Sequence, residues 1–189
     1  MRIEFSAYAD DYTVRGNVEL EGERLAALLE AAHDFDVTGL TLRALDDGRE
    51  HDLAAAQIRR EELCAVSATG PRGRPDRRVR TRAYPMRAVV GPYTIVGYFQ
   101  ALPTADPWTM LQRRQIVALS PARISFDIAG ERVEETHAGL LVMHSKVDSL
   151  DEASDADVGL SNTIEIPLAA ADARAKDMTA DLGWFGRDH

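Results

Sequence analysis

The sequence has one cysteine, few aromatic residues and no long apolar segment. The single cysteine, Cys64, excludes a disulfide framework within the chain and zinc sites of the Cys-x-x-Cys type. No apolar run approaches the roughly 18–20 residues that cross a membrane, and the first residues lack the apolar region of a signal peptide. These absences predict a cytoplasmic protein in a reducing environment, without membrane contact.

The remaining composition is that of an ordinary globular protein. Of the 189 residues, 45% are hydrophobic and 28% are charged, and a chain of this length buries enough surface to fold without metals or disulfides. The formal net charge of −9 opposes binding of nucleic acid over most of the surface. Residues 71–82 are the exception, because they hold six arginines and one acidic residue. This stretch has Pro and Gly but no apolar period, which is typical of a linker.

The sequences on the two sides of this linker are similar to each other. Residues 12–16 (YTVRG) align with residues 93–97 (YTIVG), and residues 40–42 (LTL) align with residues 124–126 (ISF). Three further apolar positions repeat with a spacing of 84: Ile58, Leu63 and Val66 pair with Val142, Val147 and Leu150. Because order and spacing agree, we predict an internal duplication.

Each copy is predicted to form a β-α-β-β-β unit. Alternating apolar residues indicate a first strand at residues 12–20, and the glycines in the middle of the two equivalent strands, Gly16 and Gly97, predict a bulge or bend. Leucines spaced three and four apart over residues 25–32 predict a short helix, as does the Asp106-Pro107 start signal in the second copy. Glycine turns at residues 46–48 and 129–130 predict hairpins.

We therefore predict a mainly β fold with short helices (α+β), made of two tandem small barrel-like units. The first β-rich repeat covers residues 1–70, the basic linker residues 71–83, and the second repeat residues 84–150. Residues 151–189 form an acidic tail with a short strand, a short helix and the terminal aromatics Trp184 and Phe185.

The apolar spacing resembles that of a known family. A strand with a central glycine, the Arg24-Leu25-x-x-Leu28-Leu29 helix and the Leu40-Thr41-Leu42 strand resemble an uncharacterised bacterial family of small β-rich domains of unknown function. The pattern is also distantly similar to Sm-type small barrels, which bind RNA as rings. The resemblance covers residues 10–68 well and residues 91–150 loosely, and it implies an architecture without an activity.

Motifs that carry catalysis are missing from the sequence. There is no GxSxG elbow, no P-loop and no GxGxxG motif before a helix. Cys64 stands in an apolar strand, where burial opposes formation of a thiolate. Glu134 and Glu135 flank a predicted strand, and carboxylates in such a place face solvent more often than they act as an acid–base pair. We predict no catalytic residue, no metal site and no cofactor, and favour a protein that is not an enzyme.

Two segments are candidate binding sites. The arginines of the basic stretch suit phosphate groups, and Arg78-x-x-x-Arg82 is similar to the arginine arm of PilZ domains, which binds a cyclic dinucleotide; the accompanying serine-glycine element is absent. The candidate residues for nucleic acid or phosphate are Arg72, Arg74, Arg77, Arg78, Arg80 and Arg82. Trp184 and Phe185 either pack on the protein itself or bind a partner.

These observations predict an interaction module, an accessory part of a larger protein assembly. Its strand edges would accept strands from an unknown protein partner or from a second copy of the chain. The alternative is binding of RNA or a nucleotide through the arginine-rich linker.

Overall fold

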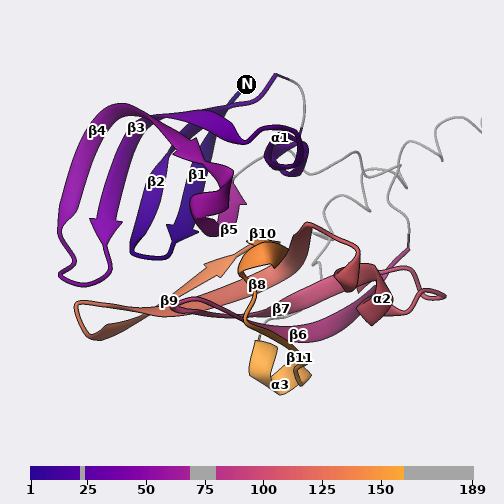
Figure 1. Cartoon of the computed structure of the whole chain (residues 1–189). Coiled ribbons are helices and arrows are strands. Elements are labelled where there is room, and N and C mark those ends of the chain that lie inside the picture. Colours follow the sequence, from indigo (N-terminus) through magenta and orange to yellow (C-terminus); the bar gives the residue numbers. More distant parts are fainter. Residues whose placement is uncertain (22–23, 69–79, 160–189) are drawn as a thin grey trace, which may run out of the picture.

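The computed structural model describes residues 1–21, 24–68 and 80–159, and these residues are rich in strands, as predicted. Residues 1–68 form β1 (Arg2–Ala9), β2 (Tyr12–Glu19), α1 (Leu25–Ala31), β3 (Asp34–Ala44), β4 (Glu50–Arg59), the 3-10 turn η1 (Arg60–Glu62) and β5 (Leu63–Ala68). Residues 80–159 form β6 (Arg82–Val90), β7 (Tyr93–Ala101), α2 (Pro107–Gln112), β8 (Ile116–Ile128), β9 (Glu131–His137), β10 (Leu140–Met143), the 3-10 turn η3 (His144–Lys146), β11 (Ser149–Glu152) and α3 (Asp155–Val158). Figure 1 shows the strands of the first half above those of the second.

The prediction of two barrel-like units is wrong, because the described strands belong to one open antiparallel sheet of 11 strands. The order is β11-β6-β7-β8-β10-β5-β1-β2-β3-β4, with β9 paired to β8 beside this path. The two halves join where β10 pairs with β5, at Leu141–Val66 and Val142–Ala65. A strand of one half thus extends the sheet of the other.

The sequence prediction also begins each unit one strand too late. Two strands, β1 and β6, precede the predicted first strands and pair along their length with β2 and β7. In β1 the polar residues Arg2, Glu4 and Ser6 alternate with buried Ile3, Phe5 and Ala7, a period-two pattern that marks a half-buried strand. Strand β6 begins at Arg82, inside the segment assigned to the linker.

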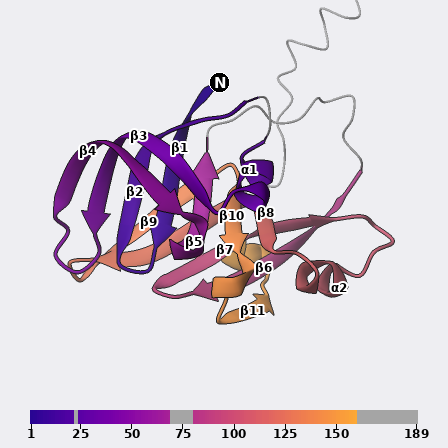
Figure 2. The same cartoon turned by 45° about the horizontal axis from the view of Figure 1, so that its top comes forward.

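The hydrophobic core crosses the boundary between the halves. Ile116 and Met143 from the second half pack into the cluster formed by the first half. In return, Tyr8, Cys64 and Ala65 pack into the cluster of the second half. Figure 2 shows β10 lying between the strands of the two halves. Because a half on its own would expose these residues, the two halves are expected to fold as one unit.

The two halves pair their strands in the same order. In the first half β5 lies beside β1, followed by β2, β3 and β4; in the second β11 lies beside β6, followed by β7 and β8. Both halves also shift register at the predicted glycine, near Gly16 in one and Gly97 in the other. The predicted bulges are confirmed, whereas the internal duplication itself stays a prediction.

Other local signals are confirmed as well. Asp106 caps α2, since its carboxylate accepts a hydrogen bond of 2.8 Å from the Thr109 backbone N–H. The glycine turns at Gly48 and Gly130 connect β3 to β4 and β8 to β9. The strand and helix predicted after residue 162 lie outside the described residues.

Candidate functional site

Most of the binding residues predicted from the sequence lie outside the described residues. This applies to Arg72, Arg74, Arg77, Arg78, Trp184 and Phe185. Of the two arginines that are described, Arg80 is exposed, and Arg82 holds its guanidinium carbon 5.3 Å from the centre of the Tyr84 ring. For the two predicted residues that it describes, Arg80 and Arg82, the structure shows no shared site.

A polar cluster that the sequence did not reveal lies between the two halves. The Tyr8 hydroxyl, on β1, donates a hydrogen bond of 2.7 Å to Glu135 Oε2 on β9 and lies 2.6 Å from His137 Nε2. Since the single hydroxyl proton goes to Glu135, the Tyr8 oxygen accepts from the His137 N–H. Arg15 Nη2, on β2, lies 2.8 Å from Glu135 Oε1. We call Tyr8, Arg15, Glu135 and His137 the interhalf cluster.

The interhalf cluster holds Glu135 in its charged form. The pKa of its carboxyl is lowered to about 2, first by the interaction with His137 and then by the hydrogen bond from Tyr8 and the Arg15 charge. Burial of the Tyr8 ring, together with its bond to this carboxylate, raises the pKa of the phenol. A general base for neutral pH would need a pKa nearer to 7. The hydrogen bonds of the cluster connect β1 and β2 of the first half to β9 of the second half.

The surroundings of Tyr8 also connect the two halves. Its ring packs edge-to-face on Tyr93 and Phe126, with ring centres 5.5 and 5.7 Å apart. The neighbouring cavity has a volume of about 40 Å³, which suits one or two water molecules and no larger ligand. From the sequence, the spacing of two residues between Glu135 and His137 predicts that both lie on the same face of β9. Nothing in the sequence indicates that Tyr8 lies opposite them.

Cys64 has the inert character predicted for it. The thiol is fully buried and donates to Asp10 Oδ1 at 3.2 Å. Burial, followed by the hydrogen bond to this carboxylate, raises the thiol pKa to about 12. Lys146 Nζ lies 2.7 Å from the other Asp10 oxygen, so the carboxylate connects β5 to the turn before β11. A neutral, enclosed thiol is not a nucleophile at physiological pH.

Strand β4 provides the longest open edge in the described part of the molecule. It has ten residues, and within that part it pairs only with β3. Its first six residues are all exposed, including Leu53 at 43% relative exposure. Ala54 and Ala55 follow Leu53 and present little side chain. Unpaired N–H and C=O groups along such an edge are available to another strand.

Further tests for a site among the described residues are negative. No group of His, Cys, Asp and Glu there has the arrangement of a metal site, and no helix there is long and apolar enough to cross a membrane. Comparison with known proteins finds no matching family model, no matching curated protein and no matching solved structure.

Proposed function

We propose that the protein is an interaction module that binds an extended segment of a partner protein along the edge of β4. The observation that carries this proposal is the contrast between β4 and β10. Both strands lie beside the third strand of their half, β3 or β8, and both run into a 3-10 turn. β10 has a second neighbour, β5, whereas β4 has β3 alone among the described strands.

The pairing of β10 with β5 indicates how an added strand would bind. It joins the halves through the register pairs Leu141–Val66 and Val142–Ala65, and the side chains of all four residues are at least half-buried. An antiparallel strand on β4 would gain main-chain hydrogen bonds in the same manner. Every second side chain of the added strand would then face the same side of the sheet, and the surface there would determine which partner binds.

The residues of β4 suggest the chemistry of that partner. The centre of the strand, residues 53–56, is apolar and carries three alanines, which leave room for larger side chains across the edge. Glu50 and Asp52 lie at one end and Arg59 at the other. The matching partner strand would have apolar residues at its centre and basic residues opposite Glu50 and Asp52.

The proposal is tested by purifying the tagged chain from its native host in the presence of nuclease. Wild type is compared with two variants. The edge variant L53K/A55K places two charges on β4. The control variant T136K places one on β9, where Thr136 is also exposed. Since all three positions are on the surface, both variants should melt within a few degrees of wild type. We expect the edge variant to lose a partner that wild type and T136K retain.

Hydrogen exchange then locates the contact. Slower exchange of the β4 amides in the complex supports the proposal. Protection of other strands without β4, or a partner retained by the edge variant, would overturn it. A second copy of the chain, found by light scattering on the purified protein, would identify the partner as the protein itself.

A further inference from the structure

An opening lies where the two halves meet, beside the turn η1 that follows β4. It has a volume of about 480 Å³, within the range of pockets that hold small molecules. Its walls come from three places: η1 in the first half, the segment between α2 and β8, and the end of β10 with η3. The lining residues are Arg60, Glu61, Gln112, Arg113, Arg114, Gln115, Ile116, Met143, His144 and Ser145. We call this opening the junction pocket.

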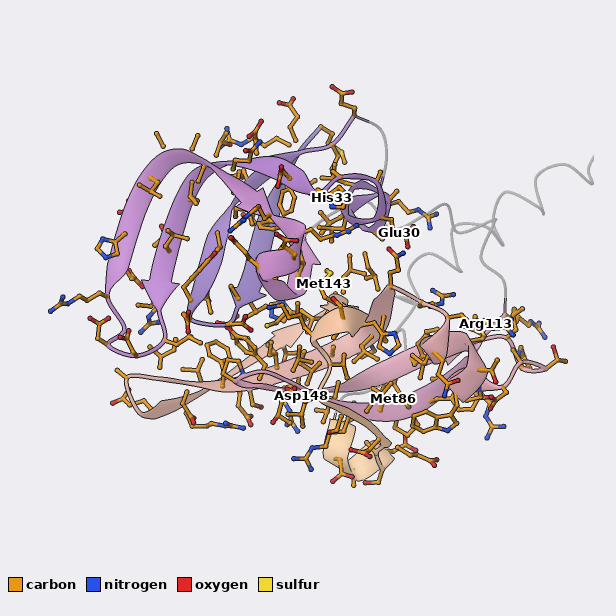
Figure 3. The ribbon with its side chains drawn as sticks, in the orientation of Figure 1. Glu30, His33, Met86, Arg113, Met143 and Asp148 are labelled. Atoms are coloured by element: carbon orange, nitrogen blue, oxygen red, sulfur yellow. The ribbon has the colours of Figure 1, made fainter. Side chains whose placement is uncertain are left out.

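The location is visible in Figure 3. Met143 lies between the halves, with Glu30 and His33 on the side of α1 and Arg113 beside α2. The two 3-10 turns that line the pocket occupy equivalent places in their halves, each directly after the strand next to β3 or β8. A ligand in the junction pocket would therefore touch both halves.

The junction pocket is positively charged in a protein whose net charge is −9. Three arginines line it against one acidic residue, Glu61. Within the described part of the chain, no carboxylate lies within 4.0 Å of the guanidinium groups of Arg60, Arg113 or Arg114. Among the other described arginines, Arg15, Arg43, Arg49, Arg59 and Arg132 have acidic partners within this distance, and Arg24, Arg87 and Arg123 have none.

Several of these groups are held in place by the fold. Arg60 Nη1 donates to the backbone oxygens of Leu29 at 2.9 Å and Glu30 at 3.3 Å, which ties η1 to the end of α1. The guanidinium of Arg114 lies 5.8 Å from the centre of the Phe99 ring. His144 Nδ1 lies 2.8 Å from the Arg114 carbonyl oxygen. Because a carbonyl only accepts, Nδ1 carries the proton, and Nε2 takes no part in this bond.

We propose that the junction pocket binds a small phosphate-bearing molecule of about the size of a mononucleotide. Guanidinium groups form paired hydrogen bonds to phosphate oxygens and keep their charge at any physiological pH. Gln112, Gln115 and Ser145 add neutral donors. Ile116 and Met143 are the apolar residues of the lining, although only 7% and 4% of their surface is exposed.

A single phosphate suits this surface better than a nucleic acid. The three arginines would neutralise one or two phosphate charges locally, whereas a polyanion would extend beyond the pocket over a protein whose net charge is −9. The concave shape likewise suits a compact ligand. The charges of the pocket come from the described residues, and the proposal does not involve the arginines of residues 72–78.

Isothermal titration of the full chain with adenosine monophosphate and with inorganic phosphate tests the proposal. We expect both probes to bind one site, phosphate to compete with the nucleotide, and R113E to weaken nucleotide binding by at least about tenfold, because a charge-assisted contact becomes repulsive. Arg113 is exposed, and its side chain donates no hydrogen bond to the described residues, so R113E should fold; R113Q is the milder variant if it does not. R132E, which changes an exposed arginine on β9, is the matched control.

Three outcomes would overturn the proposal. The first is no heat of binding with either probe at millimolar concentration. The second is equal weakening by R113E and R132E, which would indicate unspecific attraction to positive charge. The third is a single-stranded RNA oligomer that binds more tightly than the mononucleotide and depends on Arg113, which would assign the surface to nucleic acid.

Discussion

Tyr8 and Glu135 are 127 residues apart in the chain, yet the Tyr8 hydroxyl donates a hydrogen bond of 2.7 Å to the Glu135 carboxylate. This bond connects the first strand of one half to β9 of the other. It lies beside the edge-to-face contact between the rings of Tyr8 and Tyr93, so polar and apolar contacts join the halves at the same place. Unfolding of one half would break both.

Removing the Tyr8 hydroxyl should therefore destabilise the whole protein. The Y8F variant keeps the ring packing but leaves Glu135 and His137 without their shared partner. We expect a loss of about 1–3 kcal/mol in the free energy of unfolding, because a charged, partly buried acceptor loses its donor. Urea unfolding measures this loss. Y84F is the control, since the Tyr84 hydroxyl has no hydrogen bond to the described residues; a loss in Y84F as large as in Y8F would contradict this role of the Tyr8 hydroxyl.

The charge state of Glu135 predicts how stability depends on pH. Its pKa lies at about 2 in the folded protein against 4.5 for the free side chain. A folded-state pKa below the unfolded value stabilises the fold above pH 4.5, and this stabilisation is lost as the pH falls from about 4.5 towards 2. In E135Q the fall in unfolding free energy over this pH range should be smaller. An identical pH profile for E135Q and wild type would rule out Glu135 as a main cause of acid unfolding.

The two strand glycines should differ in their tolerance of a side chain. A Cβ at Gly97 would lie 2.7 Å from the backbone oxygen of Pro121, whereas a Cβ at Gly16 would lie 2.7 Å from a Val37 methyl group. The Cβ at Gly16 would also lie 3.0 Å from Leu40 Cβ, but a side-chain methyl group can move aside more easily than a backbone carbonyl oxygen. We expect G97A to cost about 2–4 kcal/mol and G16A less, as measured by urea unfolding.

Gly139 is the control for this comparison. A Cβ there would have no neighbour closer than 3.9 Å, and G139A should cost less than about 1 kcal/mol. Similar losses for G139A and G97A would show that the close approach at Gly97 is not the cause.

Native Cys64 should resist thiol reagents. Its pKa of about 12 keeps the thiol neutral at pH 8, and no part of the side chain is exposed. We expect iodoacetamide to label the folded protein only through global unfolding. Mass spectrometry of the labelled chain, with and without urea, measures this. Labelling in native buffer at the rate of a free thiol would show that the strand containing Cys64 opens by itself.

Several features of the protein follow from the sequence alone because they are local. Asp106-Pro107 predicts the start of α2 through the N-cap hydrogen bond, and the glycine turns predict both hairpins. The repeated apolar spacing predicts an internal duplication, which stays a prediction. The buried, unreactive character of Cys64 follows from its apolar neighbours.

Contacts between distant strands were decided only by the tertiary structure. The sequence predicts two tandem barrel-like units, whereas the pairing of β10 with β5 depends on edges that meet only after both halves have formed. Alternation places Glu135 and His137 on one face of β9, but it carries no information about Tyr8, the residue opposite them. The junction pocket collects Arg60, Arg113 and His144 from three segments. Strand periodicity is encoded residue by residue, whereas edge partners and shared pockets depend on which distant strands pair in the folded sheet.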